Sequence, residues 1–146
     1  MRATWKHAAR AASIVASFAG PAAAAQASRP ITVGGYGTVD FPTSTRSTVA
    51  QRAFSRGVLL LHLFHYDEAA DAFRQAEHAD SSFAMAYWGE AMTDTHPVWD
   101  EQDTAAGRKA LGKFAATADA RERAAPTERE RGYMREIGRA SCRERV

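Results

Sequence analysis

The stretch from Val49 to Met92 matches the following part of the chain when it is shifted by 34 residues, and this match restricts the possible fold more than any other sequence feature. The matched pairs are Ala50 with Ala84, Ala53 with Tyr87, Phe54 with Trp88, Gly57 with Ala91, Val58 with Met92, and His62 with His96. A repeat period of this length is typical of helix–turn–helix units. The sequence therefore predicts an all-α fold in which antiparallel helix–turn–helix repeats stack into an α-solenoid.

Residues 1–27 have the pattern of a secretory signal peptide. Three basic residues near the start precede an apolar run over residues 11–25, and Ala25-Gln26-Ala27 forms a small-x-small cleavage site. The run is too short and too rich in alanine for a membrane span of about 20 residues. We expect an exported protein, periplasmic or secreted, without stable membrane insertion after cleavage. An uncleaved anchor is the alternative.

The last residues, 136–146, form an unusual tail. They can be back-translated to a string that contains AGATCGGAAGAGC, the start of a common sequencing adapter. The tail thus resembles adapter read-through on a truncated reading frame, and the alternative is an ordinary basic helix end. We therefore leave residues 136–146 out of the fold prediction. The only cysteine, Cys142, lies in this tail, so the remaining sequence predicts no disulfide.

The net charge of +2 depends on the two ends of the chain. Without them acidic residues outnumber basic ones, and the sequence gives no support to nucleic-acid binding. The remaining charge is segregated. Residues 67–103 hold ten acidic side chains and one base, Arg74, whereas residues 104–135 hold eight bases and four acids. Solvated faces explain this pattern most simply, and an acidic rim that steers a basic partner is the alternative.

Residues 28–47 contain glycine and proline among serine and threonine, which is typical of a loop. Residues 31–33 and 38–41 could pair as short strands, but two isolated strands are marginal in water. We expect an extended, partly mobile arm, with Phe41 available to pack on the first helix.

Apolar spacing and capping patterns predict helical repeats over residues 48–135. Thr48-x-x-Gln51 and Thr127-x-x-Glu130 match capping boxes. The units cover about 48–82 and 83–120, and a third begins over 127–135. In the second unit the Ala110…Phe114 pair arrives seven residues late, which predicts either an insertion at residues 96–99 or a longer helix that starts at Asp100 or Asp103 and reaches Ala118. A polar connector is expected over residues 121–126.

Five residues at signature spacing give the chain a family resemblance. They are Gly57, Tyr66, Ala69, Phe73 and Ala76, although Ala53 replaces the usual tryptophan of the signature and Ser81 the usual proline. With the stretches at residues 56–62 and 84–92, the chain resembles tetratricopeptide-repeat proteins of a bacterial exported group without assigned function. The resemblance implies a truncated solenoid whose repeats also pack through Tyr87, Ala91, Ala110 and Phe114.

The resemblance also implies a peptide-binding groove, because the first helix of each tetratricopeptide unit faces the groove. Carried over by position, the groove residues are Phe54, Val58, Leu61 and His62 from the first unit, and Met85, Trp88, Met92 and His96 from the second. An apolar groove of this kind takes a helical or extended peptide. Core packing is the alternative for Phe54 and Val58. The leading hypothesis is a non-catalytic scaffold that binds a protein or peptide partner and needs no cofactor.

Two other functions stay open from the sequence. His62 and His96 share a repeat phase, so a metal-binding or catalytic site is conceivable, although no cysteine or His-Glu-x-x-His motif supports it. Glu90 is a candidate buried carboxylate, but a lone one more often has a structural role. Alternatively, the repeats position a catalytic domain that lies further along the full-length chain.

Overall fold

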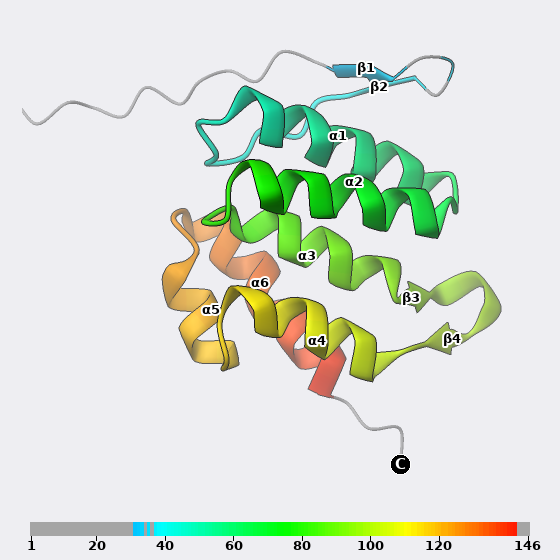
Figure 1. The fold of residues 1–146 in the computed structure, drawn as a ribbon. Helices are drawn as coiled ribbons and strands as arrows, with labels where there is room; N and C mark the ends of the chain where they lie inside the picture. The colour runs from blue at the N-terminus through cyan, green and yellow to red at the C-terminus, as the bar shows by residue number, and fades with distance from the viewer. Residues whose placement is uncertain (1–30, 34, 36, 143–146) are drawn as a thin grey trace, which may run out of the picture.

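The structure is a computed structural model that describes residues 31–33, 35 and 37–142 (Figure 1). The expected signal peptide and the end of the expected tail, residues 143–146, lie outside the described residues. The described part is all-α, as predicted. Its helices are α1 (Thr48–His62), α2 (Tyr66–Ala79), α3 (Ala84–Thr93), α4 (Thr104–Phe114), α5 (Ala118–Ala124) and α6 (Glu128–Cys142).

Successive helices pack side by side from α1 to α4, and α3 occupies the centre of the arrangement. Helices α1 and α2 pack on one side of α3, while α4 and α6 pack on the other. The short helix α5 connects α4 to α6 and packs on α6 (Figure 1). Because α3 is enclosed on several sides, most of its residues are buried, from Ala84 to Thr93.

Two small antiparallel hairpins accompany the helices. Strands β1 (Ile31–Val33) and β2 (Gly37–Val39) pair within the segment that was expected to be an extended arm. Strands β3 (Thr95–His96) and β4 (Glu101–Gln102) enclose a 3-10 turn, η1 (Pro97–Trp99), between α3 and α4. This second hairpin includes residues 96–99, where the late Ala110…Phe114 pair predicted an insertion, and α4 begins after Asp103, one of the two expected caps.

Capping side chains define the helix starts, and one differs from the prediction. The N-cap of α1 is Ser47, whose hydroxyl accepts a hydrogen bond of 3.1 Å from the Ala50 amide. The expected cap, Thr48, is therefore wrong by one residue, and the Gln51 side chain bonds to Phe41, Thr43 and Ser55 rather than closing a capping box. At α6 the Thr127 hydroxyl caps the helix as predicted by accepting from the Glu130 amide at 3.2 Å, while the Glu130 carboxylate accepts from the Thr127 hydroxyl and from the Ser44 amide.

Replacing Ser47 with alanine should lower the free energy of unfolding by about 1 kcal/mol, because an orphan backbone donor at the start of α1 loses its acceptor. The matched control is Thr48→Ala, at an exposed position one residue further on, which should change the stability by less than half as much. Urea unfolding of both variants measures the difference. Equal effects at the two positions would contradict the assignment of the cap.

The expected connector at residues 121–126 is wrong, since residues 118–124 form α5. Helix α4 ends at Phe114 rather than Ala118 because Ala115 is extended and Thr117 caps a new helix by accepting from the Ala120 amide at 3.2 Å. Arg121 is buried and donates from Nη1 to the Ala115 carbonyl at 2.8 Å. Arg121 thus holds the loop between α4 and α5 in place. The polar sequence of residues 121–126 gives no indication of this buried role.

Phe73 lies at the meeting point of α1, α2 and α3. Its side chain is fully buried, and a Cβ added at Gly57 would come within 2.7 Å of its ring. A Cβ at Gly89 would come closer still. Gly57 therefore lies where another helix approaches closely, and its counterpart on α3 is Gly89, two residues before the expected Ala91. Only glycine leaves room for both helix backbones to lie this close to the same aromatic ring.

The other expected packing residues lie mainly in two apolar clusters on either side of α3. Ala69 and Ala76 are fully buried in the first cluster, whereas Ala91 and Ala110 are buried in the second. Tyr87 is buried and its ring lies 5.1 Å from the partly buried Phe114. Tyr66 departs from this pattern, because its partly buried ring lines a surface cleft.

Candidate functional site

One face of the protein is formed by α1, α3 and α6 and is covered by the chain's own residues 39–45. We call it the arm face. The centre of the Phe41 ring lies 5.2 Å from the ring centre of Phe54, 6.4 Å from that of Trp88 and 5.8 Å from that of Tyr133. Phe54 and Trp88 therefore belong to one continuous aromatic surface, and Tyr133 of α6 extends it. Each of the three helices contributes one aromatic ring.

Polar side chains hold the backbone of the arm on this face. Gln51 donates from Nε2 to the Phe41 carbonyl at 3.0 Å, and Arg129 donates from Nη1 to the Pro42 carbonyl at 2.8 Å. The Ser44 amide donates to Glu130 Oε1 at 2.8 Å. The Arg129 guanidinium also lies 4.5 Å from the centre of the Phe41 ring. Side chains of α1 and α6 therefore hold the main chain of this segment, which is packed on the face.

The residues predicted to line the groove do not form one open surface. Phe54 and Val58 are almost completely buried, which agrees with the core-packing alternative stated for them. Met85 is also fully buried, so its side chain is not open to a peptide. Trp88 touches the arm, while Leu61 and Met92 are partly buried. The two histidines lie elsewhere, His62 exposed near the end of α1 and His96 in the β3–β4 hairpin.

The sequence missed the residues that hold the arm. The sequence places Gln51 in a capping box, and nothing in the sequence distinguishes Arg129 from the other bases of α6. Tyr133 carried a signal, since the sequence predicts a helix over residues 127–135 and Tyr133 is an aromatic residue in it, as Phe54 and Trp88 are in theirs. The polar contacts had no such signal, because they join residues as far apart as Pro42 and Arg129.

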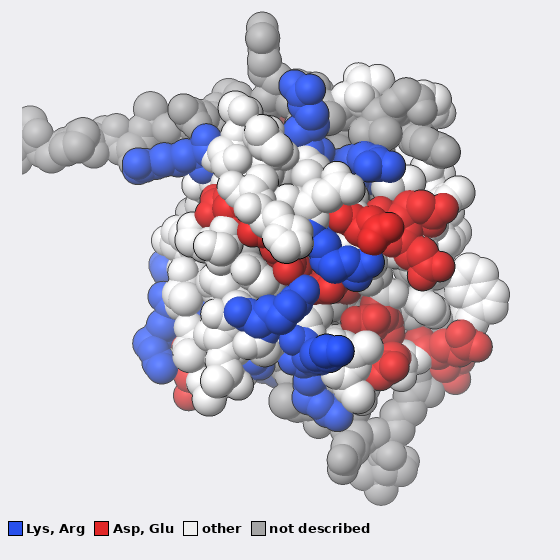
Figure 2. Space-filling model, in the orientation of Figure 1, with Lys and Arg blue, Asp and Glu red and all other residues white. Residues whose placement is uncertain are grey.

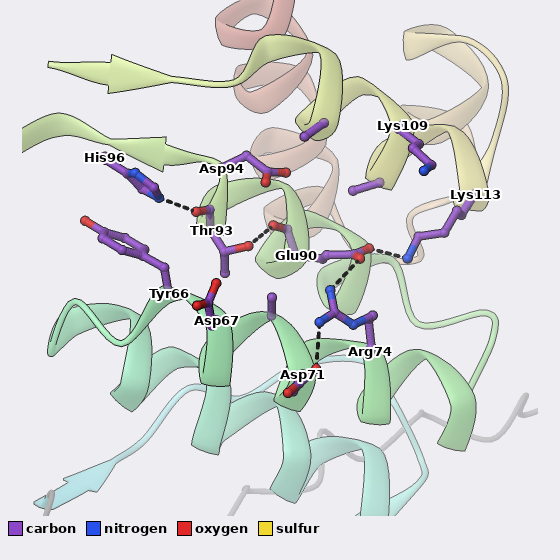
Figure 3. Close-up of a pocket in the computed structure, with 13 residues that line it drawn as sticks. Tyr66, Asp67, Asp71, Arg74, Glu90, Thr93, Asp94, His96, Lys109 and Lys113 are labelled. Atoms are coloured by element: carbon purple, nitrogen blue, oxygen red, sulfur yellow. Dashed lines mark hydrogen bonds and ion pairs between the residues drawn. The ribbon is translucent and has the colours of Figure 1, made fainter. Parts of the chain in front are cut away.

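A second feature is an open cleft between α2, α3 and α4, with a volume of about 500 Å³. Acidic residues gather near it where α2 begins and the β3–β4 hairpin lies, at the right of Figure 2. Figure 3 shows the cleft, with residues of α2 below, α3 behind and α4 above. Its charged lining consists of Asp67, Asp71, Arg74, Glu90, Asp94, Lys109 and Lys113.

An ion-pair cluster closes the inner end of the cleft. Lys113 pairs with Glu90 and, at 2.8 Å, with Glu77, while Arg74 Nη1 lies 3.4 Å from Glu90 Oε1. Burial raises the pKa of Glu77 to about 7, with the neighbouring Glu90 adding to the rise and Lys113 opposing it. Burial also acts to raise the pKa of Glu90, but hydrogen bonds from Lys113, Glu77 and Arg74 bring it below its usual value. The two carboxyl groups therefore share one ammonium group, and Glu77 holds its proton more tightly.

Aromatic residues line the outer end of the cleft. The rings of Tyr66 and His96 lie 4.0 Å apart at an angle of 30°. His96 Nε2 lies 2.9 Å from the Thr93 carbonyl, which identifies this nitrogen as the donor. Nearby, burial and the charges of Asp103 and Glu90 raise the pKa of Asp94. Carboxylate groups therefore lie close together at this end of the cleft, beside the aromatic rings.

The described residues provide no set of metal ligands around His62 and His96. His62 Nδ1 lies 2.7 Å from the Val58 carbonyl of its own helix. Among the described residues, no group of three or more histidine, cysteine, aspartate or glutamate side chains could hold a metal ion. Within the same residues, none of the helices combines the length and apolar character needed to cross a membrane.

These features define an all-α protein with one aromatic face covered by its own chain and one open, charged cleft. Comparison with protein-family models, curated proteins and solved structures finds no match. The function is therefore argued from the two surfaces.

Proposed function

We propose that this chain is an exported, non-catalytic module that binds a protein or peptide partner on its arm face. In this proposal α1–α2 and α3–α4 are two units of a tetratricopeptide-like solenoid, and α6 is the first helix of a third. The aromatic row of Phe54, Trp88 and Tyr133 supports this reading, because equivalent helices of successive units would present equivalent positions to one surface.

The observation that carries the proposal is the way in which residues 39–45 are held. An aromatic side chain inserts between rings of three helices, and side chains of the face take up two carbonyls and one amide of the adjoining backbone. Extended peptides are recognised by the same combination of main-chain hydrogen bonds and side-chain anchors. The arm therefore serves as an internal ligand that a partner of similar chemistry replaces.

A peptide of residues 38–46 should bind in trans to a Phe41→Ala variant of the full chain at least tenfold more tightly than to the wild type. In the wild type the attached arm competes at an effective concentration in the millimolar range. Removing the aromatic anchor weakens that competitor by 2 kcal/mol or more, as is typical of central aromatic contacts. Fluorescence polarisation of the labelled peptide measures both affinities.

The matched control is the same peptide with alanine in place of Phe41, which should bind neither protein. Adding Arg129→Ala to the Phe41→Ala chain should weaken the binding of the wild-type peptide, because the peptide's Pro42 carbonyl loses its hydrogen-bond donor. Far-UV circular dichroism confirms that each variant is folded. Failure of the wild-type peptide to bind a folded Phe41→Ala chain would contradict the proposal, as would equal binding of the control peptide.

A further inference from the structure

Exposed apolar side chains gather at one end of the molecule. Among the described residues, the large hydrophobic side chains that stay exposed are Leu63, Phe64, Val98, Trp99 and Val49. The first two lie in the loop between α1 and α2, and the next two in η1. The rings of Phe64 and Trp99 meet edge to face at 5.6 Å. We call Leu63, Phe64, Val98 and Trp99 the end patch.

The backbone holds the two aromatic residues of the end patch in place at an energetic cost. Within the described residues, two non-glycine positions have a positive φ: Phe64 at 62° and Asp100, next to Trp99, at 54°. This conformation costs on the order of 1 kcal/mol or more for such residues. The ring of Tyr66 supports both aromatics from below, at 6.3 Å from Phe64 and 6.0 Å from Trp99. The patch is therefore preorganised.

Carboxylate groups surround the end patch. Asp67 and Glu68 open α2 beside Phe64, and Glu101 follows Trp99 by two residues. Tyr66 lines the charged cleft (Figure 3) and also contacts Phe64 and Trp99 of the patch. The cleft therefore lies next to the patch. Asp67 and Asp94 line that part of the cleft. The acidic area at the right of Figure 2 includes this end of the protein.

We propose that the end patch and the mouth of the cleft form a docking surface for a basic segment of another protein, one that carries an aromatic or long aliphatic side chain beside lysine or arginine. The apolar side chain packs on Phe64 and Trp99, and the cation reaches the carboxylates of Asp67 and Asp94. Charge complementarity favours this partner. The carboxylate groups around the patch repel acidic segments and attract a lysine or arginine side chain. Exposed, preorganised aromatic residues are typical binding anchors. This surface is separate from the arm face.

A biased peptide library tests the proposal on the immobilised full-length chain. Each member has a central tryptophan or leucine, with neighbouring positions drawn from lysine, arginine, glutamate and serine. We expect enrichment of members with two or more basic neighbours. For an enriched peptide, Trp99→Ala should weaken binding at least tenfold, and Asp67→Asn should weaken it about threefold and reduce its salt dependence.

Val49→Ala is the matched control, because Val49 is as exposed as Val98 but lies at the start of α1. An excess of the unlabelled peptide of residues 38–46 is the second control and should leave the binding to the wild-type chain unchanged, which distinguishes this surface from the arm face. Three results would overturn the proposal: a library without enrichment of basic members, equal effects of Val49→Ala and Trp99→Ala, or self-association of the wild-type chain in sedimentation that Trp99→Ala abolishes. The last result would assign the patch to a second copy of the chain.

Discussion

Replacing Phe73 with alanine is expected to lower the free energy of unfolding by about 3–5 kcal/mol, the range found for truncating a buried aromatic side chain. Phe73 is fully buried, and its ring lies between Gly57 of α1 and Gly89 of α3 and 5.7 Å from the ring of Phe54. Its removal leaves a cavity where three helices meet, and rigid backbones on both sides prevent collapse. Denaturant unfolding followed by circular dichroism measures the loss.

Glycine variants provide the matched controls for this packing. Gly89→Ala should destabilise by about 1–3 kcal/mol, because the new methyl group collides with the Phe73 ring and the overpacking outweighs the roughly 1 kcal/mol gained in helix propensity. Gly112→Ala and Gly132→Ala add a methyl group in open space and should be neutral or stabilising. The double variant Phe73→Ala/Gly89→Ala should cost less than the sum of the single changes. If Gly89→Ala were as harmless as Gly112→Ala, the proposed contact would be wrong.

The free energy of unfolding should fall by about 2 kcal/mol as the pH rises from about 4.5 to about 7, because of Glu77. Burial raises the folded-state pKa of this carboxyl group from 4.5 to about 7. Over this interval the folded chain still holds a proton that the unfolded chain has released, so rising pH favours unfolding. Urea titrations at closely spaced pH values measure the slope.

Glu77→Gln should remove this pH dependence and make the protein more stable than the wild type at pH 8, because a neutral amide replaces a buried carboxylate beside Glu90. The reverse applies to Glu90, whose pKa is lowered. The stabilisation that the Glu90 carboxylate gives the folded chain is complete above its ordinary pKa of 4.5. It is lost as the pH falls through the lower pKa of the folded state. Glu90→Gln should therefore weaken the protein at neutral pH. An unchanged slope in Glu77→Gln would show that another group titrates.

Local patterns predicted the helices well, because each helix depends on contacts within a few residues of sequence. The start of α6 was predicted from the Thr127 cap. Errors arose where a tertiary contact competed with a local one. Gln51 could have closed the cap of α1, but the arm offers it the Phe41 carbonyl and the Thr43 hydroxyl, and Ser47 caps the helix instead.

The candidate site was predicted less completely, for the same reason. The repeat phase paired Phe54 with Trp88, and both rings contact Phe41, but the phase could not show that Phe41 lies against them. Likewise, Glu90 was singled out as one buried carboxylate, whereas its partner Glu77 and the shared Lys113 come from two other helices. Periodicity indicates which side of a helix is apolar, but the identity of the covering group depends on the packing of distant segments.

By itself, the sequence determined that this chain forms antiparallel helices with an insertion after α3, since hydrophobic period and turn residues act over short distances. Only the tertiary structure decided that the arm occupies the face of α1, α3 and α6, that Phe73 fills the space between two glycines, and that Phe64 meets Trp99. Each of these contacts joins segments far apart in the chain. Their energies depend on shape and burial, which exist only after the helices have packed.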